Sequence, residues 1–213
     1  MVKKLGTLLQ EIIYPRFCCH CRGIGWYLCP RCQLLCEFAF APPALPAPTN
    51  LKSIMIAFSF TPPISEVIKT MKYQYIKGIA DWLGELLYFH TNYPDVDVVT
   101  SVPITAEKRR LRGFNQAERI ARSFCFQAQL SYVELLKKPT SSKINQASLI
   151  DLRDRLTNVQ QTYFECVPIK KFPAKILLID DVYTTGRTLE ACAAQLLEHG
   201  VQEVHGLVVA HGR

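Results

Sequence analysis

The sequence predicts an α/β fold in which a parallel β-sheet is flanked by helices, with a small cysteine-rich module ahead of it. Apolar runs of strand length alternate with helical patterns after residue 97, and two Cys-x-x-Cys pairs lie between residues 18 and 32. An apolar run near residue 176 leads into an acidic, threonine- and glycine-rich turn. Strands separated by helices are typical of βαβ units, which bind ligands beyond the carboxyl ends of their strands.

The expected elements follow this alternation of patterns. Before it, a strand is expected near residues 54–60, and helical patterns with core-forming apolar residues run from 64 to 90. Two connections are expected to be loops, 103–115 and 137–162, and the second has little apolar periodicity. The remaining strands are expected near 97–102, 131–136, 175–180 and 203–210, with helices near 115–128 and 187–199.

Composition places the chain among ordinary globular proteins. Its 213 residues can form one full core and a small appendage, and 49% hydrophobic content argues against extensive disorder. The net charge of +7 points to anionic partners, such as phosphorylated metabolites or nucleic acid, without choosing between them. Since no apolar run reaches about 20 residues, no membrane insertion is expected.

The first residues resemble a signal peptide only superficially. Lys3 and Lys4 precede a leucine-rich run, but Gln10 and Glu11 interrupt it and no small-residue cleavage site follows. We expect an amphipathic helix packed on its own protein, with membrane attachment as the alternative. Its apolar residues fall at helical spacing: Leu5, Leu8, Leu9, Ile12 and Ile13.

Six of the nine cysteines lie between positions 18 and 36, in a pattern typical of a metal site. The knuckles Cys18-x-x-Cys21 and Cys29-x-x-Cys32 predict a structural, tetrahedral Zn²⁺ site with four thiolate ligands. A disulfide cluster is the alternative, although nothing in the sequence indicates secretion. Three further residues leave the ligand assignment open: Cys19, His20 and Cys36.

A proline-rich stretch divides the chain. Residues 41–48 cannot form a helix interior and are expected to run extended. We therefore expect three parts: an amphipathic helix and zinc-binding module at 1–40, a linker at 41–50, and the α/β domain at 51–213.

The most informative stretch is residues 176–188, in which a buried strand brings Asp180 and Asp181 to a turn before a helix. Carboxylates accept hydrogen bonds from ribose hydroxyls or hold Mg²⁺, and the N–H groups of a helix N-terminus bind phosphate. A phosphorylated ribose satisfies both halves of the motif, whereas the alternative is a plain turn whose side chains cap the next helix. The expected phosphate-binding residues are Thr184, Thr185, Gly186, Arg187 and Thr188.

Two basic segments are expected near this pocket. The segment 103–115 supplies Arg109 and Arg112 as candidates for pyrophosphate binding, with a solvated basic loop as the alternative. The segment 137–162 is expected to be either an active-site lid or a disordered connector, and its Lys138 is a further candidate for PRPP binding.

Residues 176–188 resemble the phosphoribosyl pyrophosphate (PRPP) motif of type I phosphoribosyltransferases. The chain as a whole resembles the ComF family of competence-associated, phosphoribosyltransferase-like proteins in its cysteine knuckles, its leading helix and several short motifs. The resemblance implies a type I phosphoribosyltransferase fold, a PRPP-like ligand with Mg²⁺, a zinc module and a cytoplasmic role in natural transformation. The motifs are Arg112-Gly113-Phe114-Asn115-Gln116, Gln146-x-x-Leu149, Arg155-x-x-Asn158 and Asp180-Asp181.

Two functions are expected to share the pocket. In the first, the protein binds PRPP–Mg and handles single-stranded DNA during transformation, alongside competence-machinery proteins, with Tyr73 or Phe114 stacking on bases. In the second, it is an active phosphoribosyltransferase that transfers phosphoribose from PRPP to an unidentified acceptor, with Asp180 and Asp181 at the catalytic centre.

Overall fold

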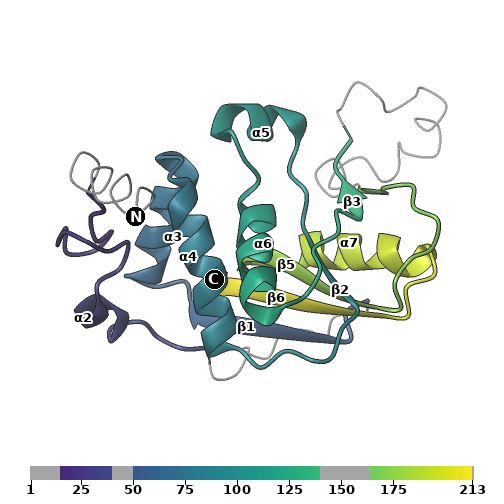
Figure 1. Cartoon of the computed structure of the whole chain (residues 1–213), viewed down its shortest axis with the longest axis horizontal. Helices are drawn as coiled ribbons and strands as arrows, with labels where there is room; N and C mark the ends of the chain where they lie inside the picture. Colours follow the sequence, from purple (N-terminus) through teal and green to yellow (C-terminus); the bar gives the residue numbers. More distant parts are fainter. Residues whose placement is uncertain (1–14, 40–49, 140–163, 213) are drawn as a thin grey trace, which may run out of the picture.

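A four-stranded parallel sheet forms the centre of the computed structural model, which describes residues 15–39, 50–139 and 164–212. Figure 1 shows the strands running side by side through the lower half of the view, with α5 above α6. All three neighbouring pairs are parallel, which confirms the expected α/β architecture. In spatial order the strands are β1 (Ser53–Ser59), β6 (Glu203–His211), β5 (Lys175–Tyr183) and β2 (Val98–Ser101).

Helices cover both faces of the sheet, and a small antiparallel pair of strands lies outside it. The pair consists of β3 (Leu136–Lys137) and β4 (Glu165–Cys166). The helices are α2 (Pro30–Gln33), α3 (Ile64–Tyr73), α4 (Lys77–His90), α5 (Ala106–Arg112), α6 (Gln116–Ala128) and α7 (Arg187–Glu198).

The central strand β5 is apolar on both sides because both sides are covered. Leu177 and Ile179 belong to a core formed with α3, α4 and α6. Ile176 and Leu178 belong to a second core formed with α7. This alternation explains why four consecutive apolar residues precede Asp180.

Helices α4 and α6 pack closely because α4 has a glycine at their contact. A β-carbon added to Gly84 would lie 2.6 Å from Cβ of Ser123 and would also meet the carbonyl oxygen of Ile120. An ion pair reinforces the contact, with 2.7 Å between Arg119 Nε and Asp81 Oδ1. The position of α6 matters for function because its first residues face the candidate site described below.

The expected end of the strand before the acidic pair needs correction. Strand β5 continues to Tyr183, so Asp180 and Asp181 lie within the strand and not in the turn that follows it. The hydrogen-bonded register with β6 extends through this region, and pairs Asp180 with Val208. Pairing with a neighbouring strand therefore extends β5 beyond the apolar run that predicted it.

The segment 103–115, which was expected to be a loop, contains helix α5. Its N-terminus is capped by Thr105, whose side chain accepts a hydrogen bond from the backbone N–H of Lys108, and it ends at Gly113 with φ of 74°. No residue of α5 is buried, so the helix has no apolar stripe to reveal it. Capping residues, not hydrophobic periodicity, are its sequence signal.

The strand expected at 131–136 is mostly irregular. Tyr132 makes an isolated parallel bridge with Val99 of β2, and the N–H of Val133 donates to the carbonyl of Val99. The N–H of Leu135 then donates to the side-chain hydroxyl of Thr100 instead of a backbone carbonyl. This side-chain bond interrupts the ladder, so only the short β3 follows.

The cysteine-rich module is packed into the main core. Cys18, Leu28 and Cys32 belong to the same buried cluster as α3, α4 and α6. Beyond the module, Phe38 forms an antiparallel bridge with Phe58 of β1. The described part of the module is therefore joined to the sheet domain by shared apolar contacts and by backbone pairing.

Several expectations concern residues outside the described ranges. These are the leading helix within 1–14, the linker residues 41–49 and most of the expected lid, including the Gln146-x-x-Leu149 and Arg155-x-x-Asn158 motifs. Among the helices of the described ranges, none combines the length and apolar character that a membrane span requires.

Candidate functional site

Strand β5 and helix α3 bring a carboxylate pair and a lysine together. Asp180 is partly buried and Asp181 is buried. The N–H of Asp181 donates to Oδ1 of Asp180 over 2.8 Å. Lys72, from the last turn of α3, donates from Nζ to Oδ1 of Asp181, also over 2.8 Å. The two acidic side chains are thus held at the border between the core and a cavity.

The protonation of Asp180 follows from this placement. Burial and the neighbouring charge of Asp181 raise the pKa of Asp180 to about 8, although the N–H of Asp181 and the ammonium group of Lys72 oppose the shift. The surroundings of Asp180 in the free protein therefore favour the protonated form of its carboxyl group. A bound cation or hydroxyl donor would favour its ionised form.

The carboxylate pair opens into a cavity of about 220 Å³. Its wall is strongly basic and is built from segments far apart in the sequence. Such a cavity suits an anion that also offers hydroxyl groups or a metal to the carboxylates. The polar side chains on its wall are Lys72, Thr105, Lys108, Arg112, Asn115, Gln116, Lys138, Asp180, Asp181 and Thr188.

Two residues at the start of α6 have different roles in this wall. Asn115 caps α6 by accepting from the N–H of Ala117, and its Nδ2 donates to the carbonyl of Val102 over 3.0 Å. Gln116 is 2% exposed, and its Nε2 has no hydrogen-bond partner within the described part of the chain. A buried amide donor without a partner in a cavity wall favours a ligand acceptor there.

The threonine- and glycine-rich turn forms the N-terminus of α7. Gly186 is the N-cap residue with φ of 74°, and no side chain makes a capping hydrogen bond there. The alternative interpretation, that the turn serves to cap the helix, therefore lacks the bond on which it depends. Thr188 lines the cavity. Thr184, Thr185 and Arg187 are exposed.

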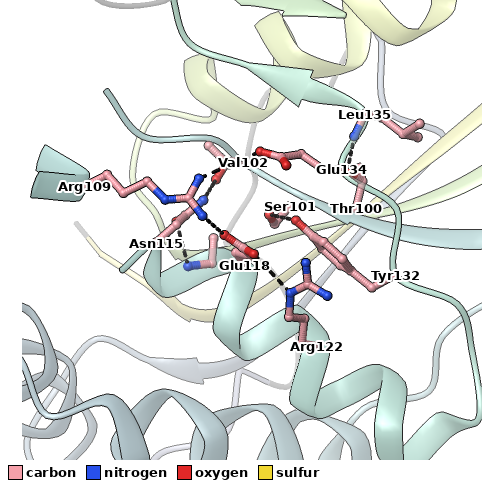
Figure 2. Close-up of polar contacts among 11 residues, drawn as sticks. Thr100, Ser101, Val102, Arg109, Asn115, Glu118, Arg122, Tyr132, Glu134 and Leu135 are labelled. Atoms are coloured by element: carbon pink, nitrogen blue, oxygen red, sulfur yellow. Dashed lines mark hydrogen bonds and ion pairs between the residues drawn. The ribbon is translucent and has the colours of Figure 1, made fainter. Parts of the chain in front are cut away.

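Arg109 is not part of the cavity wall. Its Nη2 donates to Oε2 of Glu118 over 2.8 Å, and its Nη1 lies 3.9 Å from Oε1 of Glu134 (Figure 2). Glu118 also accepts from Nε of Arg122 over 3.0 Å. Arg109 therefore ties α5 to α6, which leaves Arg112 of the two predicted arginines in the cavity wall.

The same network holds the edge of the sheet. The hydroxyl groups of Tyr132 and Ser101 lie 2.9 Å apart, and the guanidinium of Arg122 lies 4.2 Å from the centre of the Tyr132 ring (Figure 2). These contacts fix the chain beside β2 before it reaches Lys138. The ammonium group of Lys138 is thereby brought to the cavity wall.

Several residues of the cavity wall have no site role predicted from the sequence, among them Lys72, Lys108 and Gln116. Lys108 belongs to the basic cluster, and Gln116 belongs to a motif that was recognised only by resemblance. For Lys72 the sequence offers no signal, because its partner Asp181 lies 109 positions away. Phe114, suggested as a base-stacking residue, is only 8% exposed, so that suggestion was wrong.

The four cysteines predicted to bind zinc form a compact cluster. The sulfur atoms of Cys18, Cys21, Cys29 and Cys32 all lie within 4.8 Å of one another. The sulfurs of Cys21 and Cys29 are 3.6 Å apart. Around a tetrahedral zinc ion with Zn–S bonds of about 2.3 Å, sulfur atoms are about 3.8 Å apart. The cluster therefore fits a structural zinc ion without an open coordination position.

Backbone groups around Cys18 support a thiolate. Burial by itself would raise the pKa of the Cys18 thiol, but backbone N–H groups of Cys29, Cys21 and His20 bring it down to about 6. His20 lies outside the cluster, with Nδ1 2.8 Å from Oε2 of Glu66 on α3. Cys36 also lies outside, because its sulfur donates to the carbonyl of Cys32. Cys19 is buried in the shared core.

A second cavity, of about 590 Å³, lies between the cysteine module and α3. Its wall includes Arg16, Phe17, Arg22, Tyr27, Thr70 and Gln74. Exposed aromatic rings occur in the same segments, with Phe17 48%, Trp26 50%, Tyr73 72% and Tyr75 48% exposed. We call these four rings the aromatic surface.

We expect replacement of Cys21 by serine to abolish zinc binding and to lower the stability of the whole domain, because the module shares its core with α3 and α4. Loss of a structural metal in such a module costs several kcal/mol. The check is metal analysis of the purified chain together with thermal unfolding. Cys36→Ser is the matched control and should keep one zinc ion per chain; zinc retained by Cys21→Ser would contradict the assignment.

We expect Asp180→Asn to stabilise the protein by roughly 1–3 kcal/mol at pH 8, with the gain shrinking toward pH 5. In the wild type, the native state holds a proton on Asp180 between about pH 4 and pH 8 that the unfolded chain releases, so stability falls as pH rises through this window. The amide lacks this penalty. Urea unfolding from pH 5 to pH 9 measures the difference, and a constant difference across that range would refute the assignment.

Solved structures offer a partial structural match. A glutamine PRPP amidotransferase from B. subtilis, complexed with ADP and GMP, aligns with a TM-score of 0.43 and 21% identity. The alignment covers 61% of this chain and 25% of that enzyme chain.

Two sequence relatives cover more of the chain than this structure does, although no protein-family model matches the chain. It is 25% identical over 186 residues to the DNA utilization protein YhgH of Escherichia coli K12, covering 83% of this chain and 81% of the relative. Competence protein F of Haemophilus influenzae is 24% identical over 207 residues, covering 93% and 86%. Competence protein ComFC of Streptococcus pneumoniae is 31% identical over 128 residues, covering 60% and 52%. Together with the four-cysteine module and the flanked parallel sheet, these similarities agree with the resemblance of the chain to the ComF family.

Proposed function

We propose that this protein acts in natural transformation, in the cytoplasm, and binds PRPP or a similar phosphorylated ribose with Mg²⁺ in the cavity beside Asp180 and Asp181. The observation that carries the proposal is the cavity itself, where two carboxylates face a basic wall. The names of the relatives, competence proteins and DNA utilization proteins, support the cellular role.

Each part of the cavity fits one part of such a ligand. Asp180 and Asp181 would accept hydrogen bonds from the ribose hydroxyls, and the turn Thr184–Thr188 would bind the 5′-phosphate through backbone N–H groups and hydroxyls. The basic side chains Lys108, Arg112 and Lys138 would bind the pyrophosphate group. Gln116 would donate its free amide hydrogen to a ligand oxygen.

The two carboxylates also fit a magnesium ion, since Mg²⁺ prefers hard oxygen ligands and is held jointly by protein carboxylates and substrate phosphates. A bound Mg²⁺ ion would neutralise part of the negative charge of the phosphate groups. Arg109 would contribute indirectly, by holding α5 through Glu118 so that Arg112 and Lys108 remain at the cavity.

The alternative within the same cavity is an active phosphoribosyltransferase. In that reaction an acceptor nucleophile forms a bond to C1′ of the ribose while the bond from C1′ to pyrophosphate oxygen breaks, and pyrophosphate leaves. The basic wall would stabilise the departing charge. No acceptor is identified, so release of pyrophosphate in the presence of candidate bases and nucleophiles would distinguish turnover from binding.

The aromatic surface favours a second function for the protein, the binding of single-stranded DNA. Successive bases stack on exposed aromatic rings while basic groups follow the phosphates. Tyr73 and Tyr75 flank the end of α3, and Arg16 and Arg22 line the adjacent cavity. The last turn of α3 contributes to both cavities, since Lys72 lines the smaller one and Thr70 the larger one.

We expect calorimetric titration of PRPP with Mg²⁺ to show binding to the wild type and at least about 100-fold weaker binding to the double variant Asp180→Asn, Asp181→Asn. The amides preserve shape but remove both anionic acceptors, each worth about 1.5–3 kcal/mol. Asp95→Asn is the control, because its side chain is 99% exposed. Absence of binding to the folded, zinc-loaded wild type would refute the proposed ligand.

We expect the double variant Tyr73→Ala, Tyr75→Ala to bind an oligothymidylate about tenfold more weakly than the wild type. Base stacking on an aromatic ring contributes about 1–3 kcal/mol, whereas the salt dependence reports phosphate contacts and should stay unchanged. Fluorescence anisotropy at several salt concentrations measures both quantities. Phe126→Ala, at an exposed ring of α6, is the control; equal affinities for all three proteins would rule out this surface.

A further inference from the structure

Lys72 is a cationic residue of the cavity wall that contacts the carboxylate pair directly. Its Nζ lies 2.8 Å from Oδ1 of Asp181, and the two side chains are only 23% and 13% exposed. Ion pairs on a protein surface contribute little, but a pair removed from water is costly to break because each partner then loses its counter-charge. We therefore expect Lys72 to stay on Asp181 until a ligand offers each partner another counter-charge.

The position of this ammonium group competes with a metal ion. Mg²⁺ binds carboxylate oxygens at about 2.0–2.1 Å, within the region where the Lys72 ammonium group contacts Asp181. An ammonium group and a divalent cation cannot both occupy the same side of Oδ1, since they would repel each other at close range. A cation that binds Asp181 there has to displace Lys72.

The charges of the cavity wall act in the same direction. Lys72, Lys108, Arg112 and Lys138 face two carboxylates, so positive groups outnumber negative ones even with both acids ionised. A basic wall repels a bare divalent cation and attracts a polyanion. A cation already bound to phosphate groups enters with its charge compensated, and its phosphates offer oxygens to the displaced ammonium group.

We propose that Lys72 is a ligand-exchange residue that excludes free divalent cations from the carboxylate pair and releases Asp181 when a cation arrives bound to a polyphosphate. On release, its ammonium group moves from the Asp181 oxygen to a phosphate oxygen of the ligand. Lys72 is thus a selectivity residue for a metal–phosphate complex over the metal alone. The part concerning the phosphate rests on the proposed function, whereas the exclusion of free cations does not.

The test uses the zinc-loaded chain and Lys72→Met, which keeps an unbranched side chain but removes the charge. Lys69→Met is the matched control, because Lys69 is exposed one turn earlier on α3 and loses the same charge. Titration with Mn²⁺ alone, followed by electron paramagnetic resonance, reports free-cation binding. We expect Lys72→Met to bind Mn²⁺ at least about tenfold more tightly than the wild type and Lys69→Met.

The second measurement is binding of inorganic pyrophosphate without metal, which we expect Lys72→Met to weaken about tenfold. Lys72→Arg keeps a charge at the position and should exclude Mn²⁺ as the wild type does, so it tests the inference even if the methionine variant does not fold. Tight Mn²⁺ binding by the arginine variant would then overturn the proposal.

The outcomes separate this inference from the proposed function. If folded Lys72→Met binds Mn²⁺ no more tightly than Lys69→Met, the inference is overturned, even where PRPP binds the wild type. If Mn²⁺ binding tightens in Lys72→Met but PRPP binds none of the proteins, the exclusion of free cations is supported and the proposed ligand is rejected. Unchanged pyrophosphate binding would overturn the transfer of Lys72 to the phosphate.

Discussion

Strand β5 lies between β6 and β2 with both of its faces covered, and this burial determines where a charged group can occur along it. Residues Ile176 to Ile179 are fully buried, and Asp180 is the first polar residue after them. A carboxyl group at this border loses part of its hydration, which raises the pKa of Asp180, while the next residue, Asp181, obtains a counter-charge from Lys72. The basic cavity wall is organised around this border.

The cations of the wall come from separate elements, and other charged residues of the same elements hold them in place. Lys108 and Arg112 are carried by the exposed helix α5, which has no buried residue and is tied to α6 by an ion pair between Arg109 and Glu118. Within this short helix, Arg109 therefore pairs with an acidic residue of α6, whereas Lys108 and Arg112 line the cavity. Grouped positive charges repel one another and lower the stability of the free protein, and an anionic ligand would relieve this repulsion. Functional sites commonly lose stability in this way.

Helix α3 contacts both the cysteine module and the cavity. Cys18, Leu28 and Cys32 pack in the same core as Val67 and Met71, and the last turn of that helix carries Lys72. His20 adds a polar contact to Glu66 on the same helix. The module therefore has a structural connection to the carboxylate pair, and the aromatic surface extends along the same junction.

The sequence by itself determined the features that depend on neighbouring residues: the knuckle spacing of Cys18 to Cys32, the buried strand before Asp180 and the helix that follows it. Local spacing was sufficient because the spacing of zinc ligands and the apolar pattern of a buried strand are both visible within a few consecutive residues. Helix α5 was missed since only its caps, not an apolar stripe, mark it. Tertiary structure alone decided that Arg109 binds Glu118 while Arg112 reaches the cavity, and that Lys72 meets Asp181 across 109 positions. The physical reason is that an ion pair depends on which surfaces pack together, and identical charges in a sequence carry no record of that packing.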